Sequence, residues 1–140
     1  MIREARKSDS KALKEICSND LGYPCDELLV EQRITNLNTN RECVLVAEID
    51  GEILGFIHVE RYDALYYPSV VNIMALAVSK KIRRQGVGRK LICAAEEWAK
   101  GNGISVMRLN SGATRIEAHM FYRNMGFDDE KQQLRFLKKL

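Results

Sequence analysis

Residues 70–100 read VVNIMALAVSKKIRRQGVGRKLICAAEEWAK, and this stretch decides the fold. Val70–Val78 is apolar enough to form a central strand that is covered on both faces. A basic loop with two glycines follows, and residues 88–99 then have the pattern of an amphipathic helix. The apolar residues at helical spacing are Leu91, Ile92, Ala95 and Trp98. A buried strand, a loop and a helix in this order predict the first part of a β-α-β crossover.

The segments after this stretch continue the alternation of strands and helices. Two glycines end the first helix, and residues 104–109 are expected to form the second strand of the crossover. Residues 115–125 are expected to form a helix that stops at Gly126. Residues 134–137, Leu-Arg-Phe-Leu, can supply a last edge strand.

The segments before this stretch predict further strands and two helices. The expected strands are residues 2–5, 43–49 and 53–62. An Asp50-Gly51 turn joins the last two of these strands as a hairpin. One helix is expected to begin at Ser8 or Ser10, and a second, looser one near Asp26. The order βααβββαβαβ predicts an α/β fold, with a mixed sheet and helices on both of its faces.

Size and composition indicate one globular domain. The chain has 140 residues, of which 46% are apolar and 29% charged, so we expect residues 1–140 to form a single domain. Residues 1–7 alternate charged and aliphatic side chains where a signal peptide would need an apolar stretch, and no later run is long enough to span a bilayer. We therefore expect a soluble cytoplasmic protein without a membrane partner.

Cysteine spacing and charge limit the ligands. The cysteines at positions 17, 25, 43 and 93 lack the paired spacing of a zinc site, so no metal is expected. The net charge of +3 is too small to indicate nucleic acid by itself, but basic residues cluster within residues 80–90. The cluster consists of Lys80, Lys81, Arg83, Arg84, Arg89 and Lys90. Without interleaved stacking aromatics, it favours a small anionic ligand over nucleic acid.

The loop RRQGVG at residues 83–88 has the chemistry of a phosphate site. Gly86 and Gly88 let the backbone approach a ligand closely, and the free amides at the start of the following helix attract an anion. The arginines can add charge-assisted hydrogen bonds. The loop lacks the Lys-Ser or Lys-Thr of a Walker loop and the third glycine of a dinucleotide fingerprint. Two glycines at a strand-to-helix turn can also serve the turn alone.

Two motifs together resemble a known family. Arg83-x-x-Gly86-x-Gly88 after an apolar strand resembles the pyrophosphate-binding signature of the GNAT superfamily of N-acetyltransferases. The sequence AHMFYRNMGF at residues 118–127 is similar to the family's Ala-x-x-Phe-Tyr-x-x-x-Gly-Phe segment. The opening Ile-Arg-x-Ala, followed by Asp9, also resembles the family. The resemblance implies a GNAT-like fold, with a mostly antiparallel central sheet and a splayed central strand pair.

The resemblance also implies acetyl-CoA as the acyl donor and assigns residues to it. The residues around the pyrophosphate would be Arg83, Arg84, Gln85, Gly86, Val87, Gly88 and Arg89, and those along the pantetheine arm Leu76, Ala77 and Val78. Tyr122 lies at the family's general-acid position. A phenol with a pKa of about 10 is protonated at neutral pH and can donate to a departing thiolate. The alternative role of Tyr122 is that of a core aromatic.

The sequence departs from the family at the general base. Some relatives carry a glutamate in the central strand, where this chain has Asn72, Met74 and Ala75, or in the next strand, where it has Asn110. The polar residues that could relay a proton instead are His58, Glu60 and His119. A structural or solvent-facing role is favoured for His58 and Glu60, and His119 can equally pack and hydrogen-bond locally. Arg115 stands where many relatives have the asparagine that contacts pantetheine.

The expected activity is therefore acetyl transfer to a primary amine of a small molecule or a protein, by direct attack. The unassigned base leaves a non-catalytic acyl-CoA-binding domain as the alternative, and a basic nucleic-acid module as the weakest hypothesis. In this family, the first two helices and the loop before the central strand build the acceptor pocket. The aromatic and acidic residues in those segments are Tyr23, Asp26, Glu27, Tyr62, Tyr66 and Tyr67. A homodimer is consistent with the family.

Overall fold

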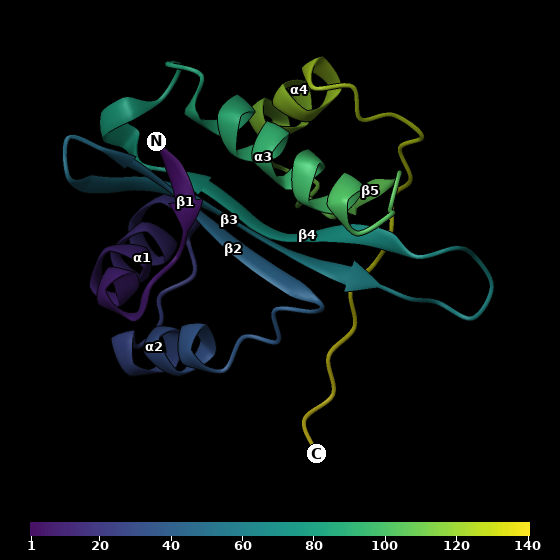
Figure 1. Cartoon of the computed structure of the whole chain (residues 1–140). Coiled ribbons are helices and arrows are strands. Elements are labelled where there is room, and N and C mark those ends of the chain that lie inside the picture. Colours follow the sequence, from purple (N-terminus) through teal and green to yellow (C-terminus); the bar gives the residue numbers. More distant parts are fainter. The chain divides into compact units, whose positions relative to one another are not determined.

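The computed structural model describes all 140 residues and divides into two compact units, Met1–Leu109 and Asn110–Leu140. The first unit contains the sheet and the helices α1, α2 and α3, and the second contains α4 (Figure 1). No helix in either unit combines the length and the apolar character that a membrane span requires.

The first unit is built on a mixed five-stranded sheet in the order β1-β2-β3-β4-β5. The strands are β1 (Ile2–Glu4), β2 (Glu42–Ile49), β3 (Glu52–Tyr62), β4 (Val70–Val78) and β5 (Met107–Leu109). All neighbours are antiparallel except β4 and β5, which are parallel and joined through α3. The structure thus confirms the mixed sheet and the crossover that the sequence predicts.

The predicted strand at residues 104–109 is paired only in its last part. The Ile104 amide donates to the Ala99 carbonyl at 3.0 Å, so residue 104 is bound to the end of α3 (Val87–Gly101) and not to a neighbouring strand. The register with β4 begins at Met107, and the Val106 carbonyl just before it accepts from the Val71 amide at 2.9 Å. The strand prediction was therefore wrong for residues 104–106.

The helices of the first unit cover opposite faces of the sheet (Figure 1). α1 (Ser10–Ile16) and α2 (Glu27–Thr35) lie on one face, and α3 lies on the other. α1 continues into a π-helical turn, Cys17–Leu21, which ends at Gly22 with a φ of +85°. Residues with such a φ are usually glycine, because a Cβ is strained there. Helices on both faces confirm the layered fold expected from the order of elements.

Each face of the sheet has its own apolar core. On the α3 face, Leu91 and Ile92 are buried, and Gly55 lets the helix approach closely. A Cβ at Gly55 would lie 3.1 Å from the Ala77 carbonyl oxygen and 3.3 Å from Leu91 Cδ1. On the opposite face, the buried cluster consists of Leu13, Ile16, Val46, Phe56 and Ala77.

The central strand β4 separates from β5 beyond a bulge. The β3–β4 register passes from His58 opposite Ala75 to Val59 opposite Ile73, which leaves Met74 as the extra residue. Pairing with β5 covers only Val71–Ile73. From the bulge to its end, β4 therefore has no partner strand on its β5 side, as the resemblance implied.

The second unit has one helix, α4 (Ile116–Asn124). Gly126 ends it with a φ of +94°, and the Phe127 amide bonds the Tyr122 carbonyl at 3.0 Å, as in a Schellman motif. The expected edge strand at 134–137 was wrong, because no helix or strand forms after α4 and Phe136 is 85% exposed. Alternation of apolar and charged residues permits a strand but does not supply the partner that a strand needs.

Candidate active site

The loop before α3 presents unpaired backbone donors. Gly86 caps the helix with a φ of +80°, and it has no side chain to accept from the first amides. The first backbone hydrogen bond of α3 runs from the Lys90 amide to the Gly86 carbonyl at 3.0 Å. The amides of residues 86–89 precede it and face the end of the helix that carries its positive partial charge. They lie within residues 83–89, which the family resemblance assigned to pyrophosphate.

The arginines of this loop have different surroundings. Arg83 donates through Nε to the Val78 carbonyl at 3.3 Å, and its Nη2 lies 3.9 Å from Asp20 Oδ1. Asp20 also accepts from the Lys80 amide at 3.0 Å. Arg84 and Arg89 are exposed at the surface. Arg83 and Asp20 thus brace the loop, and Asp20 carried no sequence signal because its partners lie some sixty residues away.

The stretch of β4 assigned to pantetheine lies on the free edge. Leu76, Ala77 and Val78 pair with β3 on one side and have no partner strand on the other. Backbone groups on such an edge can pair with an amide-rich ligand as if it were an added strand.

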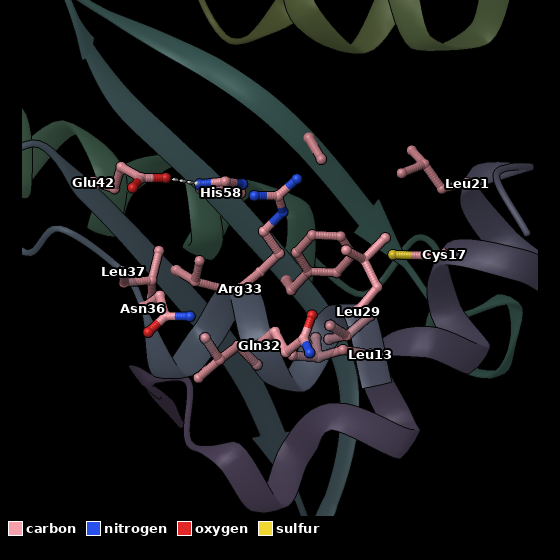
Figure 2. A pocket seen from close by; sticks show the side chains of 15 residues that line it. Leu13, Cys17, Leu21, Leu29, Gln32, Arg33, Asn36, Leu37, Glu42 and His58 are labelled. Atoms are coloured by element: carbon pink, nitrogen blue, oxygen red, sulfur yellow. Dashed lines mark hydrogen bonds and ion pairs between the residues drawn. The ribbon is translucent and has the colours of Figure 1, made fainter. Parts of the chain in front are cut away.

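A pocket of about 540 Å³ opens between α2 and the sheet (Figure 2). The π-helical turn contributes Cys17 and Leu21, the sheet contributes Phe56, and α2 contributes Leu29 and Arg33. None of the tyrosines and acids expected at the acceptor pocket lines it. Asp26, for example, caps α2 by accepting from the Leu28 amide at 3.1 Å.

His58 and Glu42 lie together in this pocket. His58 Nε2 and Glu42 Oε1 are 2.9 Å apart, and each side chain is about a quarter exposed (28% and 27%). Figure 2 shows the pair on the sheet wall of the pocket. Ala75, directly opposite His58 on β4, lines the same pocket. The pocket therefore reaches β4 beside the bulge at Met74.

The other two candidate proton relays are placed differently. Glu60 does not line this pocket. His119 belongs to the second unit, where its Nε2 bonds the Gly112 carbonyl at 2.8 Å. Because a carbonyl only accepts, that nitrogen must carry the proton.

Two further side chains set the chemistry of the pocket. The Arg33 guanidinium points into it and forms no ion pair or hydrogen bond with another residue (Figure 2). Burial raises the pKa of the Cys17 thiol to about 11, so this thiol is protonated at neutral pH. The pocket thus offers an unpaired cation and no thiolate nucleophile.

Tyr122 lies on α4 in the second unit. Its ring meets those of Phe121 and Phe127 edge to face, with centroids 5.4 and 5.7 Å away. Burial raises the pKa of its phenol, and the nearby Arg115 guanidinium opposes that shift more weakly. The hydroxyl is therefore a proton donor at neutral pH. Arg115 itself is the residue that precedes the first turn of α4.

Asn72, one of the three β4 residues considered in place of the relatives' glutamate, is an amide that already has a hydrogen-bond partner. Asn72 Oδ1 accepts from Arg108 Nη1 at 2.7 Å, and the Arg108 guanidinium lies 4.9 Å from the Tyr62 ring centroid. An amide has no proton-accepting site comparable to a carboxylate. Asn72 therefore cannot replace the glutamate.

Comparison with protein families gives a match over most of the chain. The family described as "Acetyltransferase (GNAT) family" matches residues 10–127. An aminoalkylphosphonate N-acetyltransferase of Salmonella typhimurium is 30% identical over 144 residues, covering 99% of this chain and 90% of that protein. The rat N-acetyltransferase family 8 member 3 is 32% identical over 94 residues. That alignment covers 66% of this chain but only 41% of the rat protein.

Solved structures share the fold across the whole chain. A Bacillus halodurans protein described as a transcriptional regulator has a TM-score of 0.85 at 24% identity, covering 99% of both chains. The aminoglycoside acetyltransferase AAC(6')-Iy, in complex with a CoA-containing bisubstrate analogue, has a TM-score of 0.83 at 20% identity. It covers all of this chain and 98% of its own. At these identities the likeness establishes the fold alone.

Proposed function

The chain belongs to the acetyltransferase (GNAT) family, and on that premise we propose that it transfers the acetyl group of acetyl-CoA to a primary amine of a small molecule. One observation carries this proposal. Ala75, which follows the bulge at Met74, lines the pocket beneath α2 and also belongs to the free edge of β4, so a donor on the edge and an acceptor in the pocket would adjoin there. We also propose that residues 1–140 act as one N-acetyltransferase domain, because the family match extends into both units.

The residues around the loop and the edge suit coenzyme A. The amides of residues 86–89 would hold the pyrophosphate, with Arg84 and Arg89 adding charge from the surface. Gly86 has open space on the side where a Cβ would project, so a phosphate can approach the backbone. Leu76–Val78 would pair with the pantetheine amides. Arg83 would act mainly by holding the loop in place.

The pocket suits a small amine that also carries an anionic group. Arg33 supplies a cation that no protein carboxylate neutralises, and an anionic acceptor could pair with it. The Salmonella relative is named for aminoalkylphosphonates, which contain both an amine and such an anion. A polycation such as an aminoglycoside fits this pocket less well, because Arg33 would repel it.

Acetyl transfer would proceed by direct attack of the amine on the thioester carbonyl. A route through an acetylated cysteine is disfavoured, because the Cys17 thiol in the pocket remains protonated. Tyr122 would act as general acid, and its hydroxyl would donate a proton to the departing sulfur. The raised pKa of Tyr122 keeps that proton available throughout the neutral range.

Release of free coenzyme A thiol, measured with an amine panel, tests the proposal. The panel should contain 2-aminoethylphosphonate, amino sugar phosphates, uncharged alkylamines and peptide amines. We expect turnover with acetyl-CoA, and faster turnover with the anionic amines than with uncharged amines of similar size. Tight binding of acetyl-CoA without turnover on any amine would instead identify a non-catalytic acyl-CoA-binding domain.

A further inference from the structure

We propose that His58 is the general base that deprotonates the acceptor amine and that Glu42 positions its ring, an inference that rests on the proposed acetyl transfer. An acceptor ammonium must lose a proton before it can attack, since its pKa is near that of a lysine, about 10. The chain has no carboxylate where some relatives carry a glutamate, at the positions of Asn72, Met74, Ala75 and Asn110. A histidine on β3 and a glutamate on β2 would replace that carboxylate.

The sheet register places His58 at the pocket wall. His58 faces Ala75 across the β3–β4 ladder, and both residues line the pocket. Directly opposed side chains on neighbouring strands have Cβ atoms about 5 Å apart. The adjoining residue of β4 is Met74, the bulge beyond which the strand has its free edge. A base at His58 is therefore within one side-chain length, or one water molecule, of the edge proposed to hold the donor.

The hydrogen bond to Glu42 fixes which nitrogen of His58 can act. Glu42 is two residues along β2 from Val44, the residue opposite His58, so the contact is a diagonal one. A carboxylate can only accept a hydrogen bond, so Nε2 carries the hydrogen in the 2.9 Å contact, and Nδ1 has the free lone pair. No other residue forms a hydrogen bond with the His58 side chain. The tautomer and the orientation of the ring are thus set for Nδ1 to accept.

Each proton that the acceptor loses in this reaction can then be accounted for. An acceptor ammonium gives one proton to His58 Nδ1 and becomes a neutral amine, whose lone pair forms the new C–N bond while the C–S bond breaks. Glu42 stabilises the resulting imidazolium, which releases its proton to solvent. The sulfur receives a proton from Tyr122, and the second proton lost from nitrogen restores the phenol through water. The net products are an amide, a thiol and one proton.

Other groups in the pocket are poorer bases. The Cys17 thiol is protonated at neutral pH. Arg33 is a cation under all physiological conditions. Glu60 lies outside the pocket, although its Cα is the register partner of Glu42. This position makes Glu60 a matched control, because it has the same side chain on the facing strand.

Two acceptor amines that differ in pKa distinguish a role of His58 in proton removal from a purely structural role. The probes are 2-aminoethylphosphonate and 2-amino-1,1-difluoroethylphosphonate, whose fluorines lower the amine pKa so that much more of it is uncharged at the same pH. With the first probe, we expect His58→Gln to lower kcat by about 100-fold or more, as for loss of a general base. With the difluoro probe, the loss should be several times smaller. Coenzyme A affinity should not change with either.

The variants of the two glutamates complete the test. Glu42→Gln keeps an acceptor for Nε2 but loses the charge, so we expect a smaller fall in kcat, about tenfold, with KM nearly unchanged. Glu60→Gln should retain wild-type kcat. Free imidazole should restore part of the activity of His58→Ala, a response that a purely structural histidine would not give.

Two kinds of result would overturn the inference, and they are distinguishable. If wild type turns over but His58→Gln loses the same factor with both acceptors, or loses nothing, His58 is not the base, and the proposed function stands. If wild type binds acetyl-CoA but acetylates no amine in the panel, the proposed function fails and the inference fails with it. Thermal unfolding and coenzyme A binding of each variant confirm that a loss is not due to misfolding.

Discussion

α3 and α2 cover opposite faces of the same sheet, but they are packed in different ways. α3 has 15 residues, and Val87, Leu91, Ile92, Ala95 and Ala99 are all buried. α2 has 9 residues, none of which is buried, and much of its inner side lines the 540 Å³ pocket. One helix therefore closes a core, and the other covers a cavity.

The difference extends to the chemistry of the two faces. The proposed cofactor site uses backbone amides and a glycine at the start of α3, so its strength depends on main-chain geometry. The proposed acceptor site uses side chains from α2, the π-helical turn, β2 and β3. A site made of main-chain groups suits coenzyme A, which is the same in every reaction of this kind. A site made of side chains can be changed by substitution, to fit another acceptor, without disturbing the core. The variants below test this contrast, from the largest expected effect to the smallest.

The largest contrast should appear in stability. Leu91 is fully buried beneath α3, so Leu91→Ala should lower the free energy of unfolding by about 3 kcal/mol or more. Leu29 is 44% exposed on α2 and borders space that is already open, so Leu29→Ala should cost less than about 1 kcal/mol. Denaturant titrations of both variants measure the difference. Equal losses would mean that α2 is as firmly packed as α3.

Gly86→Val tests whether the cofactor site is a backbone site. A valine at a φ of +80° is strained, and its side chain would project into the open space that a phosphate needs. We expect coenzyme A affinity to fall by about 100-fold, as for the loss of two charge-assisted hydrogen bonds. Isothermal titration calorimetry measures the coenzyme A affinity of the variant and of the wild type.

Gly22→Val is the matched control for strain. Gly22 has a φ of +85°, and, as at Gly86, a Cβ added there would meet no atom within 4 Å, but this glycine ends the π-helical turn. The variant should lose comparable stability while coenzyme A affinity stays at the wild-type value. Equal affinity losses in the two variants would show that strain, and not the phosphate site, is responsible.

The two faces also differ in how far the sequence alone could predict them. β4 was expected at Val70–Val78 and has those bounds in the structure, because a continuous apolar run can only be stable when buried. Gly126 was expected to end the last helix and does so with a φ of +94°, because a glycine that ends a helix can be recognised from the sequence. The roles assigned to residues 76–78, 83–89 and Tyr122 came from a family resemblance, and they stay predictions.

The acceptor pocket could not be predicted, because its walls come from segments far apart in the sequence. Glu42 and His58 meet only through the β2–β3 register, and Arg33 joins them only through the position of α2. The expected Tyr66 is instead 86% exposed in the β3–β4 connection, where its ring packs edge to face against that of its neighbour Tyr67. A cavity is a property of spacing between elements, and periodicity carries no information about that spacing.

Tyr122→Phe tests whether loss of the proposed proton donor slows the chemical step without weakening the binding of coenzyme A or of the acceptor. The ring packs against Phe121 and Phe127, and phenylalanine preserves those contacts while removing the donor. We expect kcat to fall by about 10- to 100-fold, near the low end for acid catalysis because water can partly substitute. Coenzyme A affinity and acceptor KM should be unchanged.

The pH dependence of the wild-type enzyme gives an independent check on Tyr122. Because burial raises the pKa of this phenol, loss of its proton should lower activity only above its ordinary pKa of 10. A decline in kcat through the neutral range that disappears in Tyr122→Phe would contradict this assignment. Wild-type turnover in the Phe variant, with the chemical step rate-limiting, would identify Tyr122 as a packing residue.

Arg33→Met should give the smallest effect, and it tests the acceptor face by itself. Methionine keeps a long apolar stem on α2 and removes only the charge, so stability should change by less than about 0.5 kcal/mol. A charge-assisted hydrogen bond contributes about 1.5 to 3 kcal/mol, and the exposure of Arg33 reduces that value through solvent screening. The KM for 2-aminoethylphosphonate should therefore rise about tenfold, with kcat nearly constant.

An uncharged alkylamine of similar length should show no rise in KM, because it has no group to pair with Arg33. A similar rise for both amines would mean that Arg33 shapes the pocket without recognising an anion, and the acceptor class proposed from its charge would then be wrong.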